Sequence, residues 1–154
     1  TYDSAYFRAF EEVALPLMRA YRPDVIVLEL GMDALAGDPL THLRLTNNVF
    51  VEILQELLAL QKPLLITGGG GYNVENTVRG WTLAWKTLHP DSDHDPSIGM
   101  GGVMLQSTEW VGGLKDRQLP VSSAERASVE PMVEETIRKL KRALFPLHGL
   151  NASC

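Results

Sequence analysis

Residues 24–40 read DVIVLELGMDALAGDPL, and residues 63–73 read PLLITGGGGYN. Each stretch begins with a short aliphatic run that follows a proline and ends in a loop rich in glycine. Such runs are typical of buried strands, and the helical pattern between the two predicts that they pair in parallel. Both loops then leave the carboxyl ends of parallel strands, so the sequence places Asp33 and Tyr72 on the same rim of the sheet. Ligands gather at this rim in parallel sheets.

Helices are expected over residues 3–20, 47–60, 75–88 and 123–145. Asp3 and Thr46 are the predicted N-caps of the first two helices, and Pro16 predicts a kink or an early end in the first. Trp81 and Trp85, which lie four residues apart in the third helix, are expected in the core. Helices that alternate with strands indicate an α/β fold with a mainly parallel sheet covered on both faces.

The composition is that of an ordinary globular domain, with 45% apolar and 21% charged residues. A formal net charge of -5 argues against direct binding to nucleic acid, which calls for a basic surface. No apolar stretch approaches the roughly 18 residues of a membrane helix, so no membrane partner is expected. The only cysteine is Cys154, so no intrachain disulfide is possible. The absence of a signal-peptide pattern favours a cytoplasmic location.

Two side chains on the predicted rim are candidates for chemistry. A carboxylate such as Asp33, held just beyond a buried strand, suits a divalent metal ion, although Asp33 and Asp38 can also simply cap turns. The glycines at 68–71 allow a ligand close to the backbone, while the Tyr72 hydroxyl can donate a hydrogen bond to a developing oxyanion. The alternative is a structural turn with a packed tyrosine. A phosphate cradle is disfavoured, because no lysine followed by serine or threonine comes after the glycines.

Together the two loops resemble the histone deacetylase family, which includes the bacterial acetoin-utilisation proteins. The resemblance rests on LELGMDALAGDPL at residues 28–40 and LITGGGGYN at residues 65–73. It continues through Asn76, Arg79 and Trp81, and it covers roughly residues 1–88. The sequence of the first loop is closer to the acetoin-utilisation and class I type than to class II.

This resemblance implies a three-layer α/β sandwich of the arginase and deacetylase type. Residues 1–154 are then the C-terminal part of a single deacetylase domain. Within it, residues 1–88 form the core that carries the motifs, 89–120 are expected to be mainly loop, and 121–154 to form a C-terminal helix and tail.

The resemblance also implies roles for individual residues. Asp33 matches the family's last zinc ligand, and Tyr72 matches the tyrosine that polarises the acetamide carbonyl and stabilises the oxyanion. Leu40 matches a wall residue of the narrow channel that holds the acyl-lysine stem, and Gly70 lies where the glycine run borders that channel. Zinc is the implied cofactor.

Other groups that the family's site needs have no match here. The family uses an aspartate and a histidine as further zinc ligands and a pair of histidines as general acid and base. The resemblance assigns these to a missing N-terminal half, and the isolated chain is therefore expected to be inactive. The histidines of this chain, His42, His89, His94 and His148, match none of them. Glu29 and Met32 depart from the class I pattern, but neither change removes a reacting group.

The expected function is that of the C-terminal portion of a zinc-dependent deacetylase acting on acetyl-lysine or a related N-acetyl amide. One alternative is a hydrolase of acetylpolyamines or other small amides. Another is a non-catalytic half that associates with a partner chain through an exposed sheet edge. His42 is interpreted as a surface residue. A further acidic cluster is interpreted as a solvated loop rather than a metal site, and it comprises Asp91, Asp93, His94 and Asp95.

Overall fold

The computed structural model describes residues 1–90 and 113–152. Its elements are α1 (Asp3–Ala9), a π-helical segment (Phe10–Ala14), α2 (Leu15–Tyr21), β1 (Ile26–Leu30), α3 (Asn47–Ala59), β2 (Leu64–Gly68), α4 (Val74–Leu88), α5 (Ser123–Leu144) and a 3₁₀ helix (Phe145–His148). The helices predicted over 47–60, 75–88 and 123–145 are confirmed to within one residue at each end. Most of the loop expected over 89–120 lies outside the described residues, as does the acidic cluster with His94.

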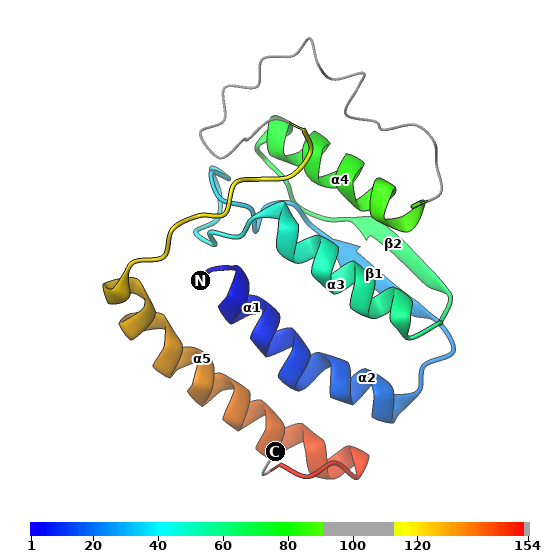
Figure 1. The fold of residues 1–154 in the computed structure, drawn as a ribbon. Helices are drawn as coiled ribbons and strands as arrows, with labels where there is room; N and C mark the ends of the chain where they lie inside the picture. Colours follow the sequence, from blue (N-terminus) through cyan, green and yellow to red (C-terminus); the bar gives the residue numbers. More distant parts are fainter. Residues whose placement is uncertain (91–112, 153–154) are drawn as a thin grey trace.

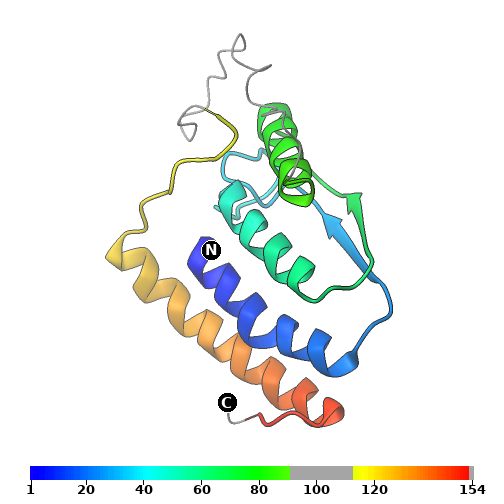
Figure 2. The same ribbon diagram turned by 45° about the vertical axis from the view of Figure 1, so that its right-hand side comes forward.

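The two strands form a parallel pair, as the sequence predicts, with Ile26 opposite Leu64 and Leu30 opposite Gly68. Figures 1 and 2 show α4, α3, the α1–α2 helix and α5 side by side, and the strands lie behind α3 in Figure 1 and to its right in Figure 2. Ile26 and Leu30 are buried, whereas Val27 and Leu65 are 65% and 56% exposed. Within the described residues, the strands are therefore buried on one face only. A layer over the other face stays a prediction.

The main core lies between the strands and α3. Val49 and Leu54 of α3 have no exposed surface, and Leu57 is nearly as deeply buried. These residues pack with Ile26 and Leu30 of β1 in one cluster. Each such aliphatic side chain contributes about 1.5–3 kcal/mol when it is fully buried. The core therefore fixes β1, and with it the loop that follows β1, against the start of α3.

The first helix continues through Pro16 instead of ending there. The π-helical segment stands just before the proline, and Leu15 donates its backbone N–H to the Phe10 carbonyl, five residues back. Proline has no N–H to complete a regular turn, and a π segment is a common way to accommodate such a break in the ladder.

The predicted N-cap at Asp3 is wrong, because Tyr2 occupies that position and makes no side-chain cap. The Asp3 carboxylate instead accepts hydrogen bonds from the Thr46 backbone N–H at 2.7 Å and from the Thr46 hydroxyl at 2.6 Å. A tertiary partner has replaced the local one. Thr46 itself caps α3 as predicted, since its hydroxyl accepts from the Asn48 N–H at 3.3 Å.

Helix α4 turns a face to the core that differs from the one its sequence suggests. Trp81 packs against the main core as expected. The expectation that Trp85 lies in the core is wrong, because its side chain is 62% exposed and stacks on the His89 ring at 4.2 Å. The buried positions of α4 include Asn76 and Arg79, two polar residues. Polar contacts rather than apolar ones therefore orient this part of the helix.

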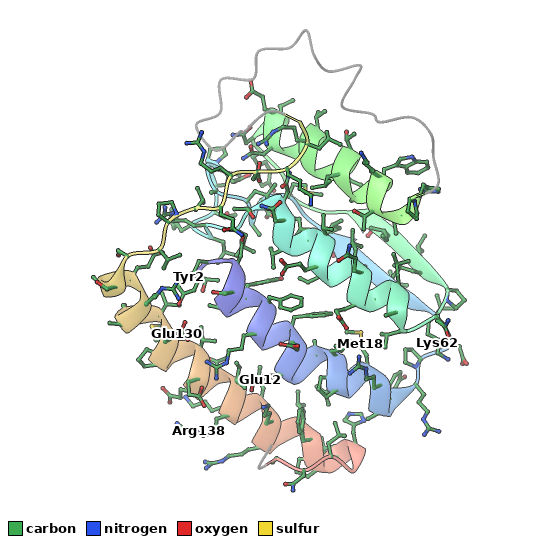
Figure 3. All side chains as sticks on the ribbon, in the orientation of Figure 1. Tyr2, Glu12, Met18, Lys62, Glu130 and Arg138 are labelled. Atoms are coloured by element: carbon green, nitrogen blue, oxygen red, sulfur yellow. The ribbon has the colours of Figure 1, made fainter. Side chains whose placement is uncertain are left out.

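Helix α5 lies along the first helix, where Ile137 of α5 packs with Val13 and Phe145 in a second buried apolar cluster, and charged groups flank this contact. Arg8 of α1 pairs with Glu130 and Glu134 of α5, and the Lys141 ammonium lies 2.6 Å from the Glu12 carboxylate. The labelled side chains of Glu12 and Glu130 in Figure 3 lie at this boundary. No helix among the described residues is both long and apolar enough to span a membrane.

Candidate functional site

The loops that carry Asp33 and Tyr72 meet beyond the carboxyl ends of β1 and β2. The Met32 backbone N–H donates to the Gly70 carbonyl at 2.7 Å, which extends the contact between the two chain segments past the last paired residues, Leu30 and Gly68. Both loops therefore leave the sheet on the same side. The structure brings the two candidate residues to one rim, where the order of the elements predicts them.

The half-buried Asp33 lies directly against the glycine run. A Cβ atom added to Gly70 would collide with the Asp33 carboxylate, and one added to Gly31 would come within 2.8 Å of Asp33 Oδ1. The Thr41 hydroxyl donates to the Asp33 backbone carbonyl. The absence of side chains at both glycines thus makes room for this carboxylate.

Tyr72 is held through its backbone, and its side chain is 54% exposed. Its backbone N–H donates to Asp38 Oδ2 at 2.9 Å, while Asp38 Oδ1 accepts from the Leu40 N–H at 2.9 Å. Burial of the Asp38 carboxyl raises its pKa, but the backbone N–H groups of Tyr72, Leu40 and their neighbours outweigh burial, and the pKa lies below its ordinary value. Asp38 is therefore the turn-capping aspartate of the two, and it links the loops.

Gly71 shapes the chain just before Tyr72. Its φ of +149° is a conformation that side-chain-bearing residues rarely adopt, and an added Cβ would come within 2.6 Å of the Thr77 hydroxyl. The rest of the rim is open. Leu40 is 65% exposed, and His42 is exposed on the surface as expected.

A buried polar network that the sequence did not reveal lies behind the rim. Arg79, 1% exposed, forms an ion pair with Asp116, and its Nη2 donates to Asn76 Oδ1 at 2.8 Å. Asn76 in turn donates to the Ala36 carbonyl at 2.9 Å. Asn76 and Arg79 lie three residues apart, so a polar pair on one helical face was the only available signal. Asp116 is too distant in sequence to have given one.

The described residues do not form a complete zinc site. A catalytic zinc ion normally has three protein ligands, but no group of three or more His, Cys, Asp or Glu side chains within residues 1–90 and 113–152 is placed to hold a metal ion. Asp33 has the chemistry of one such ligand and lies on the rim. The candidate site is therefore one carboxylate and one exposed phenol, supported by Asp38 and the buried network.

Fold and rim together define an α/β protein with a candidate ligand site at the carboxyl ends of a parallel pair. Residues 1–88 match the family model of the histone deacetylase domain. The match covers more than half of the chain, and the chain therefore belongs to the histone deacetylase domain family.

Individual relatives agree with this assignment. Histone deacetylase 8 of Xenopus laevis is 39% identical over 80 residues, which are 52% of this chain and 25% of that protein. Histone deacetylase 9 of Arabidopsis thaliana is 38% identical over 81 residues, 53% of this chain and 19% of that protein. Type-1 histone deacetylase 1 of Dictyostelium discoideum is 35% identical over 86 residues, 56% of this chain and 17% of that protein. The chain thus spans a quarter or less of the length of these relatives.

Proposed function

We propose that this chain is the C-terminal portion of a zinc-dependent deacetylase that hydrolyses acetyl-lysine or a related N-acetyl amide. It supplies Asp33 as one zinc ligand and Tyr72 as the hydroxyl that stabilises the oxyanion. The observation that carries the proposal is the meeting of the two loops, through the Met32 to Gly70 hydrogen bond, in a member of the histone deacetylase family.

The Tyr72 side chain has the chemistry that its proposed role requires. A phenol donates a hydrogen bond to a carbonyl oxygen, and that bond strengthens as the oxygen gains negative charge. The exposed ring stands on a backbone that Asp38 fixes, so part of its positioning is already built into the fold. Zinc, when bound, would polarise the amide carbonyl and activate water.

The proposal also requires the rest of the domain. The other zinc ligands and the histidine acid and base come from an N-terminal half, which would add a layer over the exposed Val27 and Leu65 and complete a three-layer sandwich. Leu40 and Gly70 then border the channel for the acyl-lysine stem. On this account the isolated chain is inactive, and the complete protein acts in the cytoplasm without binding nucleic acid or a membrane.

The test is Tyr72→Phe in the complete protein that contains this chain. Loss of one oxyanion hydrogen bond should lower kcat by a factor of about 10²–10³ and leave KM nearly unchanged. Tyr21→Phe is the matched control, because Tyr21 is 70% exposed at the end of α2, away from the rim. Unchanged turnover in Tyr72→Phe would refute the oxyanion role.

Two further measurements on the complete protein test the substrate class and the metal. Comparing kcat/KM for an acetyl-lysine peptide and for N-acetylspermidine separates protein deacetylation from polyamine deacetylation. Asp33→Asn should abolish stoichiometric zinc binding by the complete protein, measured by metal analysis after dialysis. Retention of one zinc ion per molecule would remove Asp33 from the ligand set.

A further inference from the structure

Asp116 lies beyond the residues that match the deacetylase family, yet it reaches back to the candidate site. We propose that Asp116 is a positioning residue, which acts through Arg79 and Asn76 to hold the Asp33 loop and the start of α4 in register. Its catalytic meaning rests on the proposed function, whereas the positioning itself does not.

The first link ties residues 114–116 to the start of α3. The Asn47 N–H donates to Asp116 Oδ2, and the Asp116 N–H donates to Asn47 Oδ1, both at 2.9 Å. The Asn47 side chain also donates to the Leu114 carbonyl at 2.8 Å. Asn47 is 1% and Asp116 8% exposed. A reciprocal, buried pair of this kind fixes both backbones, and the carboxylate also lies at the positive end of a helix.

The second link carries the constraint into α4. The other oxygen of Asp116, Oδ1, pairs with Arg79 Nη1, and Arg79 Nη2 donates to Asn76. No residue of the described chain accepts from Arg79 Nε. Among the described residues, Asp116 is the only carboxylate that pairs with this buried guanidinium. Without the charge of Asp116, the buried Arg79 guanidinium would be unpaired. It should then move toward water and displace α4.

The third link reaches both candidate loops. Asn76 donates to the Ala36 carbonyl, three residues beyond Asp33, and its backbone N–H donates to Asn73 Oδ1 at 3.2 Å. Asn73 directly follows Tyr72 in the chain. A shift of Asn76 would therefore disturb the Asp33 loop and the cap of α4 together.

Asp3 offers a matched control for this chain of contacts. It also binds the start of α3 with its carboxylate, through the Thr46 backbone N–H and the Thr46 hydroxyl. Its position on α1 gives it the same capping task without a contact to Arg79. Asp3→Asn and Asp116→Asn both weaken the start of α3, but only Asp116→Asn should reach the rim.

The experiment is hydrogen–deuterium exchange of this 154-residue chain, followed at peptides covering 31–38, 46–50 and 70–77. In the native chain the amides of Ala36, Tyr72 and Thr77 are hydrogen-bonded. Asp116→Asn should speed exchange in 31–38 and 70–77 about tenfold, the effect of losing one good hydrogen bond. Asp3→Asn should speed exchange only in 46–50.

A second variant keeps the proposal testable if Asp116→Asn does not fold. Asn76→Ala cuts the last link and keeps the buried ion pair, so exchange should rise at both rim peptides and stay native in 46–50. If Asp116→Asn folds and either rim peptide keeps its native rate, or if Asn76→Ala leaves either one native, Asp116 does not position the rim.

The catalytic consequence is measured separately in the complete protein. Asp116→Asn should lower kcat more than it raises KM, and Asp116→Glu, which keeps the charge, should recover part of the loss. If the native complete protein hydrolyses no acetyl amide, the proposed function fails while the exchange result still stands. If it is active and Asp116→Asn has native kcat despite faster rim exchange, positioning does not serve catalysis.

Discussion

At the scale of single residues, the rim depends on glycines, which leave space, as much as on the side chains that fill that space. Asp33 occupies the space that a Cβ of Gly70 would take, and Gly31 yields space from the other side. Asp38 then fixes Tyr72 through its backbone. Close packing against a carboxylate therefore explains the glycine at position 70, which a sequence pattern alone leaves open.

Gly70→Ala should destabilise the chain by about 1–3 kcal/mol, because the new methyl group must displace the Asp33 carboxylate or the backbone. The free energy of unfolding in urea measures the effect. Gly68→Ala is the control, since the nearest described side chain to its Cβ would be Trp81, at an ordinary 3.8 Å. Equal stability of the two variants would contradict the close packing of Gly70 on Asp33.

At the scale of elements, the helices are fixed by different mixtures of apolar and polar contacts. Helix α3 is buried through apolar residues such as Leu54, and α4 is oriented by Asn76 and Arg79. Helix α5 combines a small apolar cluster around Ile137 with ion pairs at its edge. The ion pairs make part of the attachment of α5 sensitive to pH and salt.

The docking of α5 should weaken in acid. Hydrogen bonds from Lys141 and then Arg8 hold the pKa of Glu12 below its ordinary value. A carboxyl whose pKa is lowered by folding stabilises the protein above its unfolded pKa of about 4.3, and that stability is lost as the pH falls through the folded pKa. Amide exchange in α5 should therefore be faster at pH 3.5 than at pH 7, after correction for intrinsic rates.

Glu12→Gln should remove this pH dependence in part and lower stability at pH 7 by about 1 kcal/mol, a modest value because the pair is partly exposed to solvent. Glu135→Gln is the control, because Glu135 pairs with Lys139 within α5, at 2.7 Å, and both side chains are largely exposed. A pH response in Glu12→Gln as large as in the native chain would show that Glu12 does not control the docking.

At the scale of the whole molecule, the helices of the described residues lie on one side of the parallel strand pair. On the other face, Val25, Val27 and Leu65 are each more than half exposed. Both outer strand edges are unpaired within the described residues, and such edges and patches promote association.

The isolated chain should therefore self-associate as its concentration rises. Sedimentation velocity between about 5 and 200 μM, the range in which weak contacts become visible, measures this. Replacing Val27 and Leu65 together by threonine should reduce association and leave helix content unchanged. Val74→Thr is the control, because Val74 is 75% exposed but lies on α4. Equal association in all three proteins would place the contact elsewhere.

Much of the arrangement that positions the site was predictable from the sequence. The aliphatic runs at 26–30 and 64–68, the glycines that end them and the periodicity of α3 are local signals, and they placed Asp33 and Tyr72 on one rim. These features depend on neighbours within a few residues, where propensity and pattern act directly. The same motifs identified the family.

Tertiary structure alone decided the partners that are distant in sequence. The Asp3 carboxylate binds Thr46 instead of capping α1, the Trp85 side chain faces solvent, and Asp116 completes a buried network around Arg79. A buried charge needs a polar or charged partner, and that partner can be far away in the sequence. No local sequence pattern therefore predicts it. The sequence determined which elements form and where their ends meet, and three-dimensional packing decided which polar groups hold those ends in place.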